Sequence, residues 1–170
     1  MPPPSFDATE HGPDTGQIGA KTEANQIRSR RMSVLAKAQP DRLEALWQKF
    51  DAHPKWQPLK ATETGMVMVR GRLGGTGDAF NLGETTVTRA AVRLEDGRVG
   101  LSYVAGRDHQ HAETAAVLDA LLQGQDDECD LERAIIRPIE TEAQDSKAKR
   151  ARKTAATKVD FFTVVREREA

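Results

Sequence analysis

The stretch from Asp108 to Gly124 constrains the fold most, because it predicts a helix that cannot stand alone in water. Asp108 suits the N-cap position, and Gly124 suits the position just after a helix end. Apolar side chains cover more than half of the helix circumference. They are Ala112, Ala115, Ala116, Val117, Leu118, Ala120, Leu121 and Leu122. We expect this helix, over about 108–123, to pack on a sheet or on a partner protein.

A sheet is predicted between residues 56 and 106, where glycines alternate with short β-prone segments. The strand candidates are Met66–Arg70, Glu84–Leu94 and Val99–Ala105. Asp96-Gly97 stands between the last two, and this dipeptide is typical of a tight two-residue turn with positive φ. The pattern therefore predicts an antiparallel sheet packed with helices, which is an α+β fold.

The N-terminal part divides into a tail and a pair of helices. Residues 1–27 hold four prolines and three glycines among few large apolar residues, so we expect a disordered tail. Apolar residues at helical spacing then predict helices at about 29–39 and 41–51, separated at Pro40. We expect a packing pair rather than a DNA-binding helix-turn-helix, because the connecting turn is poorly defined. Residues 28–170 are expected to form one domain.

Two charge blocks and an apolar segment follow the central helix. Residues 125–146 carry eight acidic and two basic side chains, whereas residues 147–158 carry six basic and no acidic ones. The blocks could pair, or they could form a solvated acidic loop followed by a solvated basic helix. The β-prone segment 159–165 must be covered, either by this chain's own sheet or by adding as a strand to a partner subunit. Its interface candidates are Val159, Phe161, Phe162 and Val164.

Charge and metal-ligand content disfavour several classes of function. The 25 Lys and Arg residues against 26 Asp and Glu leave a net charge of −1, so no global field recruits nucleic acid or an anionic membrane. Nucleic-acid binding through the basic segment 147–158 is therefore the least favoured alternative. The single cysteine, Cys129, excludes an internal disulfide and an iron–sulfur cluster of the chain's own. His109 and Glu113 share a helix side but lack a further ligand, so we expect no metal.

We expect a cytoplasmic protein without a membrane partner. The first residues lack the basic region and apolar run of a signal peptide. The sequence also lacks a run of about 18 apolar residues, which a membrane-spanning helix would need.

Residues 71–77 contain glycines at the density expected where backbone amides approach an anion. The spacing fits neither a P-loop nor the dinucleotide fingerprint, so a flexible bend is the plain alternative. Arg89 and Arg93 lie four apart in a predicted strand and therefore point to one face. There they could clamp a phosphate, pair with carboxylates or stay solvated. The candidate ligand residues from the loop are Arg72, Gly74 and Gly75.

Residues 106–113 are the strongest local candidate for a ligand site. If Asp108 caps the helix, the amides that follow are free and Arg107 and His111 lie near them, which favours an anion. The alternative is that Asp108 acts only as a cap, while the histidines stay exposed or bond to neighbouring backbone.

Six motifs occur in one colinear order between Arg31 and Arg166. They are Arg31-Met-Ser-Val-Leu-Ala36 with Gln39-Pro40, Glu63-Thr-Gly65, Arg72-Leu-Gly-Gly-Thr-Gly77, Thr88-Arg-Ala-Ala-Val-Arg-Leu94 before Asp96-Gly97, Gly106-Arg-Asp108 with Gln110-His-Ala-Glu113, and Val159-Asp-Phe-Phe-Thr163. Together they resemble the PhnG family, the G subunits of the bacterial carbon–phosphorus lyase core complex. Residues 1–27 lie outside this resemblance.

The resemblance implies a subunit of a transferase complex for phosphonate catabolism that is not catalytic alone. In the family, subunits G, H, I and L displace adenine from MgATP by methylphosphonate, giving α-D-ribose 1-methylphosphonate 5-triphosphate. Subunit J later breaks the carbon–phosphorus bond, and the transfer chemistry is usually assigned to subunit I. The implied partners are therefore H, I, J and L, with MgATP a substrate of the complex and no cofactor in this chain. The alternative is that Arg107, His111 and the Gly71–Gly77 loop bind the nucleotide or phosphonate here.

Overall fold

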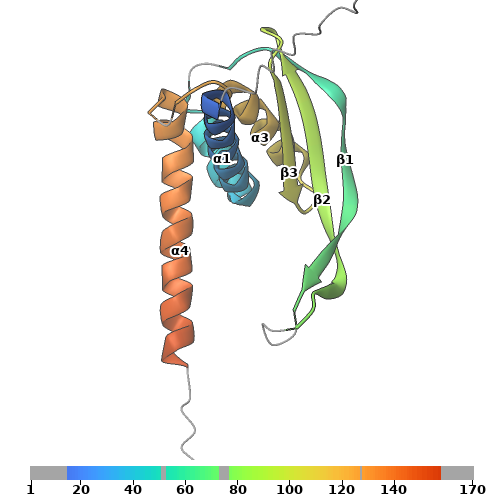
Figure 1. Ribbon diagram of the computed structural model, residues 1–170, viewed down its shortest axis with the longest axis vertical. Coiled ribbons are helices and arrows are strands. Elements are labelled where there is room, and N and C mark those ends of the chain that lie inside the picture. Colours follow the sequence, from blue (N-terminus) through green and yellow to red (C-terminus); the bar gives the residue numbers. More distant parts are fainter. Residues whose placement is uncertain (1–14, 51–52, 73–76, 127, 158–170) are drawn as a thin grey trace, which may run out of the picture.

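The computed structural model describes residues 15–50, 53–72, 77–126 and 128–157. Its elements stack from a three-stranded sheet through one central helix to further helices on the other side (Figure 1). The α+β fold expected from the sequence is confirmed. In chain order the elements are α1 (Thr15–Lys37), α2 (Pro40–Trp47), β1 (Trp56–Gly71), β2 (Phe80–Leu94), β3 (Val99–Ala105), α3 (His109–Leu122), the π-helical turn η2 (Glu132–Ile136) and α4 (Arg137–Ala156).

The sheet is antiparallel throughout, in the order β1-β2-β3. β1 pairs with β2 from Trp56↔Leu94 to Gly71↔Phe80, whereas β3 reaches only from Val99 to Ala105, which lies opposite Val87. The far half of the β1–β2 hairpin therefore extends beyond β3 as a two-stranded projection. We call this part, Met66–Gly71 with Phe80–Thr86, the arm.

The turn between β2 and β3 differs from the tight two-residue turn expected at Asp96-Gly97. The hairpin itself is confirmed, but its loop spans residues 95–98, and of these Gly97 takes positive φ (89°) while Asp96 does not. Asp96 instead uses its carboxylate to accept hydrogen bonds from the Arg98 backbone N–H and Nε, at 3.0 and 2.8 Å. Arg98 Nη1 then donates to the Leu121 carbonyl at the end of α3 (2.9 Å), so the loop also caps that helix.

Helix α3 lies at the centre of the core and confirms the first expectation. Asp108 is its N-cap, and the Asp108 carboxylate accepts from the His111 backbone N–H at 2.9 Å. One side of α3 packs on β2 and β3, and the other packs against α1 and α2. Its small side chains let the sheet approach closely, and Ser102 Oγ donates to the Ala112 carbonyl at 2.6 Å.

Helix α1 begins much earlier than expected. It runs from Thr15 rather than about 29, so residues 15–27, expected to belong to a disordered tail, are helical. The four prolines that suggested disorder all precede Asp14. Residues 15–27 contain no proline, so nothing in their backbone prevents a helix. Residues 1–14 lie outside the described residues, and the division into tail and single domain stays a prediction.

Helix α2 begins at Pro40, where the missing N–H costs nothing, and ends at Trp47 rather than at 51. Helices α1 and α2 both pack on α3, and Leu35, Leu43 and Trp47 are among their buried side chains. Within the described residues, no helix is both long and apolar enough to span a bilayer.

The acidic block is only partly the expected solvated loop, since Asp126 and Glu128 are exposed outside the helices. Residues 132–146 are helical, in η2 and the first turns of α4, and Glu132, Glu140 and Glu142 pair with arginines of α1 and α2. The buried side chains of Ile135, Ile136 and Ile139 stabilise this helical segment, and a count of charges does not reveal them. The basic block does form a solvated helix, because α4 is exposed from Thr141 onward. The expected strand at 159–165 lies outside the described residues.

Candidate functional site

The arginines expected to bind an anion are spread along the sheet. Arg93 lies near the start of β3, while Arg72 directly follows the end of β1 at the tip of the arm, where Gly71 pairs with Phe80. Arg93 lies thirteen positions after Phe80 along β2, which corresponds to roughly 40 Å at about 3.3 Å per residue. Arg107 lies between these ends, so the structure does not bring the guanidinium groups together around one ligand.

Arg89 and Arg93 share one face of β2, as expected, and both are exposed while Thr88, Ala90 and Val92 are buried. Arg89 is held by the neighbouring strand, since its Nε donates to Glu63 Oε1 at 2.7 Å. Lys60 Nζ donates to the same oxygen at 2.6 Å. These hydrogen bonds, from Lys60 first and Arg89 second, hold the pKa of Glu63 below its ordinary value of 4.5. The geometry therefore favours the carboxylate-pairing alternative for Arg89.

A pH-dependent contribution follows from this cluster. Because the pKa of Glu63 is lowered in the folded chain, its ion pairs stabilise the fold above pH 4.5 and are lost as pH falls through the lower folded-state pKa. We expect Glu63→Gln to be less stable than the wild type at about pH 6, and the difference in stability to be smaller at about pH 3, below the ordinary pKa of the carboxyl. Urea denaturation at both pH values measures this. A difference that persists unchanged in acid would show that the carboxylate charge is not responsible.

Arg107 is exposed and lines an open hollow of about 520 Å³ at the base of the arm. Thr64, Gly65, Met66 and Thr86 line the rest. A single arginine with two threonine hydroxyls offers few donors for a triphosphate, which is usually held by several cationic and backbone groups. Arg107 stays a candidate contact for a ligand. The described residues that line this hollow do not include the general acid or base that a catalytic site would need.

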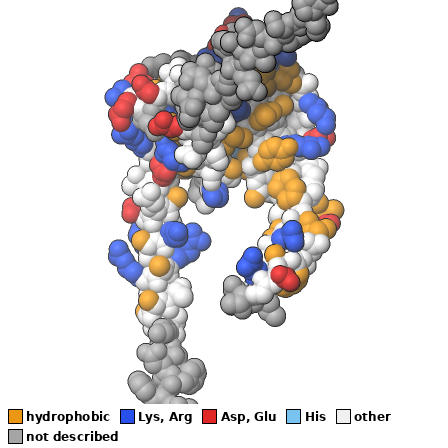
Figure 2. Space-filling view, viewed as in Figure 1, with side chains coloured by type: hydrophobic (Ala, Val, Ile, Leu, Met, Phe, Trp, Pro, Cys, Tyr) orange, Lys and Arg blue, Asp and Glu red, His pale blue; other side chains and the backbone are white. Residues whose placement is uncertain are grey.

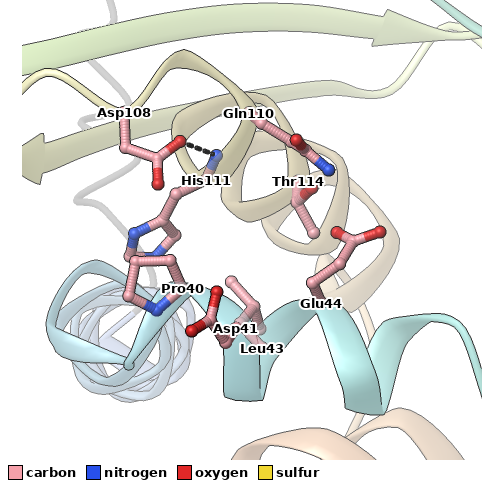
Figure 3. A pocket seen from close by; sticks show the side chains of 8 residues that line it. All are labelled: Pro40, Asp41, Leu43, Glu44, Asp108, Gln110, His111 and Thr114. Carbon is pink, nitrogen blue, oxygen red and sulfur yellow. Dashed lines mark hydrogen bonds between the residues drawn. The ribbon is translucent and has the colours of Figure 1, made fainter.

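His111 is only 5% exposed and does not share the hollow of Arg107. Its Nε2 lies 2.8 Å from the Leu35 carbonyl, which ties α3 to α1. Figure 3 shows that the ring borders a different hollow, of about 110 Å³, between the starts of α2 and α3. Carboxylates of Asp41, Glu44 and Asp108 also line it, and their charge disfavours a phosphate or phosphonate there. The geometry matches the alternative in which the histidine bonds to nearby backbone.

The pair considered as metal ligands serves to attach α3 to β1. Thr62 Oγ1 donates to Glu113 Oε1 at 2.6 Å, and Thr64 Oγ1 lies 3.1 Å from His109 Nε2. Within the described ranges, no three His, Cys, Asp or Glu side chains gather closely enough to hold a metal ion.

Several candidates fall outside the part of the chain that the structure describes, and their roles stay predictions. They are the loop glycines Gly74 and Gly75 and the interface residues Val159, Phe161, Phe162 and Val164.

A buried ionic network was missed by the sequence analysis. Glu132 is fully buried and accepts hydrogen bonds from Arg31 Nε (2.8 Å) and Arg30 Nη2 (2.5 Å). The buried Arg31 also donates to the carbonyls of Leu122, the last residue of α3, and of Gln125 beyond it, both at 3.0 Å. These partners lie about a hundred positions apart in the sequence, and no local pattern connects them. The network fixes the helices relative to one another.

A second carboxylate holds α1 against the sheet. Asp119 of α3 is buried and accepts two hydrogen bonds from Arg28, from Nε at 3.0 Å and Nη2 at 2.7 Å. The same carboxylate accepts from the Leu101 backbone N–H at 3.0 Å. It thereby satisfies a donor on β3, which is an edge strand of the sheet.

The exposed arm was also missed by the sequence analysis. Figure 2 shows hydrophobic side chains gathered along the limb that the hairpin forms. The run Met66-Val-Met-Val69 was predicted as a strand, and its lack of polar alternation was the available signal. The exposed large apolar residues of the arm are Met66, Val67, Met68, Val69, Phe80 and Leu82.

Comparisons with known proteins agree with the motifs. A family model described as phosphonate metabolism protein PhnG matches residues 26–167. The PhnG subunit of alpha-D-ribose 1-methylphosphonate 5-triphosphate synthase from Rhizobium meliloti (strain 1021) is 44% identical over 135 residues. The aligned part covers 79% of this chain and 86% of that protein. Residues 26–167 include the arm, the buried networks and every candidate residue named above.

Proposed function

The chain belongs to the PhnG family of phosphonate metabolism proteins, and from this premise we propose that it is a subunit of an α-D-ribose 1-methylphosphonate 5-triphosphate synthase complex. The observation that carries the proposal is the 44% identity over 135 residues to a subunit of that synthase. In the proposed reaction, methylphosphonate displaces adenine from MgATP. Subunits H, I and L take part with this chain in the cytoplasm, and J belongs to the same core complex. MgATP is a substrate of the complex, and this chain carries no cofactor.

The geometry supports a role in assembly and support rather than independent catalysis. The exposed arginines Arg72 and Arg93 lie at opposite ends of β2, and His111 is engaged with the Leu35 carbonyl. An active site that transfers a ribosyl group needs groups preorganised around the reacting centre. The described residues instead offer a packed core and an arm with exposed large apolar side chains.

Co-expression with subunits H, I and J tests the proposal. The chain is expected to elute with them from a size-exclusion column as one species much larger than its own 18.7 kDa. A chain that always elutes as a monomer, apart from the other subunits, would contradict the proposal.

The rival proposal, ligand binding by this chain itself, makes a different prediction for Arg107. If the chain acts by supporting the complex, Arg107→Ala should leave turnover within about twofold of the wild type, because a side chain that makes no transition-state contact does not alter the barrier. A direct phosphate contact in the transition state would instead be worth about a hundredfold or more. Adenine release by the assembled complex measures this, with size exclusion confirming that assembly is intact.

A further inference from the structure

The arm exposes large apolar side chains on both of its faces. Successive strand residues point to opposite faces, so Met66 and Met68 lie on one face and Val67 and Val69 on the other. Met66 is 68% exposed, Leu82 59% and Met68 56%, although a soluble monomer rarely leaves such side chains together in water. α3 covers the sheet where β3 is present, and the arm extends past that cover. The arm therefore lacks the burial that normally stabilises a two-stranded hairpin.

Because apolar side chains are exposed on both faces of the arm, the kinds of surface that could cover it can be compared. Pairing with a strand along its edge would satisfy backbone groups but leave both faces in water. Packing against a flat surface, including another copy of the arm, would cover one face. A cleft with two apolar walls covers both faces, and the flexible Met66 and Met68 can adapt to its shape.

A second limb projects on the same side of the molecule as the arm. α4 leaves the core after Ile139 and is exposed from Thr141 to Ala156 (Figures 1 and 2). Between Lys147 and Lys153 it carries five basic and no acidic side chains. A long solvated helix without an apolar face is weakly stabilised by itself. A body that occupies the space beside the arm can also meet this basic part of α4.

We propose that the arm inserts into an apolar cleft of another protein subunit of the synthase complex, and that an acidic surface of that subunit contacts α4. The inference rests on the proposed function, which supplies the kind of partner. It goes further by assigning the contact to two limbs of this chain and by stating the chemistry of the surface they meet.

Glutamate substitutions on the arm test the first contact. Met68→Glu and Leu82→Glu place a charge inside the proposed cleft, and we expect each to weaken binding to the assembled H, I and J subunits by about thirtyfold or more. The matched control is Tyr103→Glu on β3, because Tyr103 is 57% exposed and lies outside the arm. The control should bind within about threefold of the wild type.

Several outcomes would overturn the assignment to the arm. Equal losses for Tyr103→Glu and the arm variants would show that any charge on the sheet interferes. Unchanged binding of the arm variants, beside a wild type that does bind, would refute the arm while leaving the proposed function intact. A wild type that fails to bind would refute the proposed function itself. Dimers of the isolated chain that disappear in the arm variants would identify a second copy as the occupant.

Folding of the variants can be checked separately, because the arm lies outside the core. The urea midpoint of each isolated variant should equal that of the wild type, so a loss of binding cannot be attributed to unfolding.

Charge reversal in α4 tests the second contact. Lys149→Glu with Arg152→Glu should weaken subunit binding by about tenfold at low salt and by less at high salt, because exposed charges are screened. An unchanged affinity for the subunits, together with a lost salt-dependent affinity for duplex DNA, would assign α4 to nucleic acid and overturn this part of the proposal.

Discussion

Glu132→Ala is expected to lower the free energy of unfolding by about 3–5 kcal/mol, because it breaks a buried ion pair by removing the carboxylate. Glu132 is fully buried and accepts from both Arg30 and Arg31. Arg31 is itself only 4% exposed and cannot turn into water, since it also donates to backbone carbonyls at and just after the end of α3. Removing one carboxylate thus disturbs α1, α3 and η2 together. Urea denaturation of the isolated chain measures the loss.

A matched control separates the effect of burial on stability from the effect of removing a negative charge. Glu140 also pairs with Arg30, but its side chain is 30% exposed, so Glu140→Ala should cost less than about 1 kcal/mol. Glu132→Gln keeps an acceptor and should fall between the two. Equal urea midpoints for the Glu132→Ala and Glu140→Ala variants would contradict the importance assigned to the buried pair.

Gly100→Ala is expected to cost about 1–3 kcal/mol or more, the usual range for overpacking a core. A Cβ built on Gly100 would lie 1.9 Å from the Ala116 carbonyl oxygen and 2.7 Å from the Ala120 nitrogen. Both are backbone atoms of α3, so no side chain can rotate away. The helix would have to move off the sheet, which also strains the hydrogen bond from Ser102 to Ala112.

Gly65→Ala provides the control for this prediction. Gly65 is also in a strand, but nothing lies within 4 Å of the position its Cβ would take. Its substitution should therefore be neutral or slightly stabilising. Thermal unfolding of both variants compares them directly. A Gly100→Ala variant that melts with the Gly65→Ala variant would show that α3 does not pack as closely as described.

The elements that sequence could predict are those specified by nearby residues. The cap at Asp108 and the apolar run after it place α3 within one residue of His109–Leu122. Val99–Ala105 coincides with β3. Long-range features were not accessible in this way. β1 begins at Trp56 rather than Met66 because pairing with β2 stabilises a stretch whose local pattern is mixed.

The candidate site was harder to predict, because its properties depend on contacts between residues that are far apart in the sequence. Burial of Glu132 requires arginines about a hundred positions earlier in the chain, so the acidic block could not be recognised as partly internal. The place of His111 near a helix start predicted a ligand contact. In the structure its ring instead lies against α1, with Nε2 near the Leu35 carbonyl. The exposure of the arm depends on how far β3 extends, and strand prediction alone does not show which strands remain uncovered.

The central claim is that this chain supports the synthase complex without carrying its chemistry. The most direct measurement is adenine release from MgATP and methylphosphonate by subunits H, I and L, with and without this chain. Release is expected only when the chain is present, and the chain alone should release none. Equal release in its absence, or release by the isolated chain, would contradict the claim.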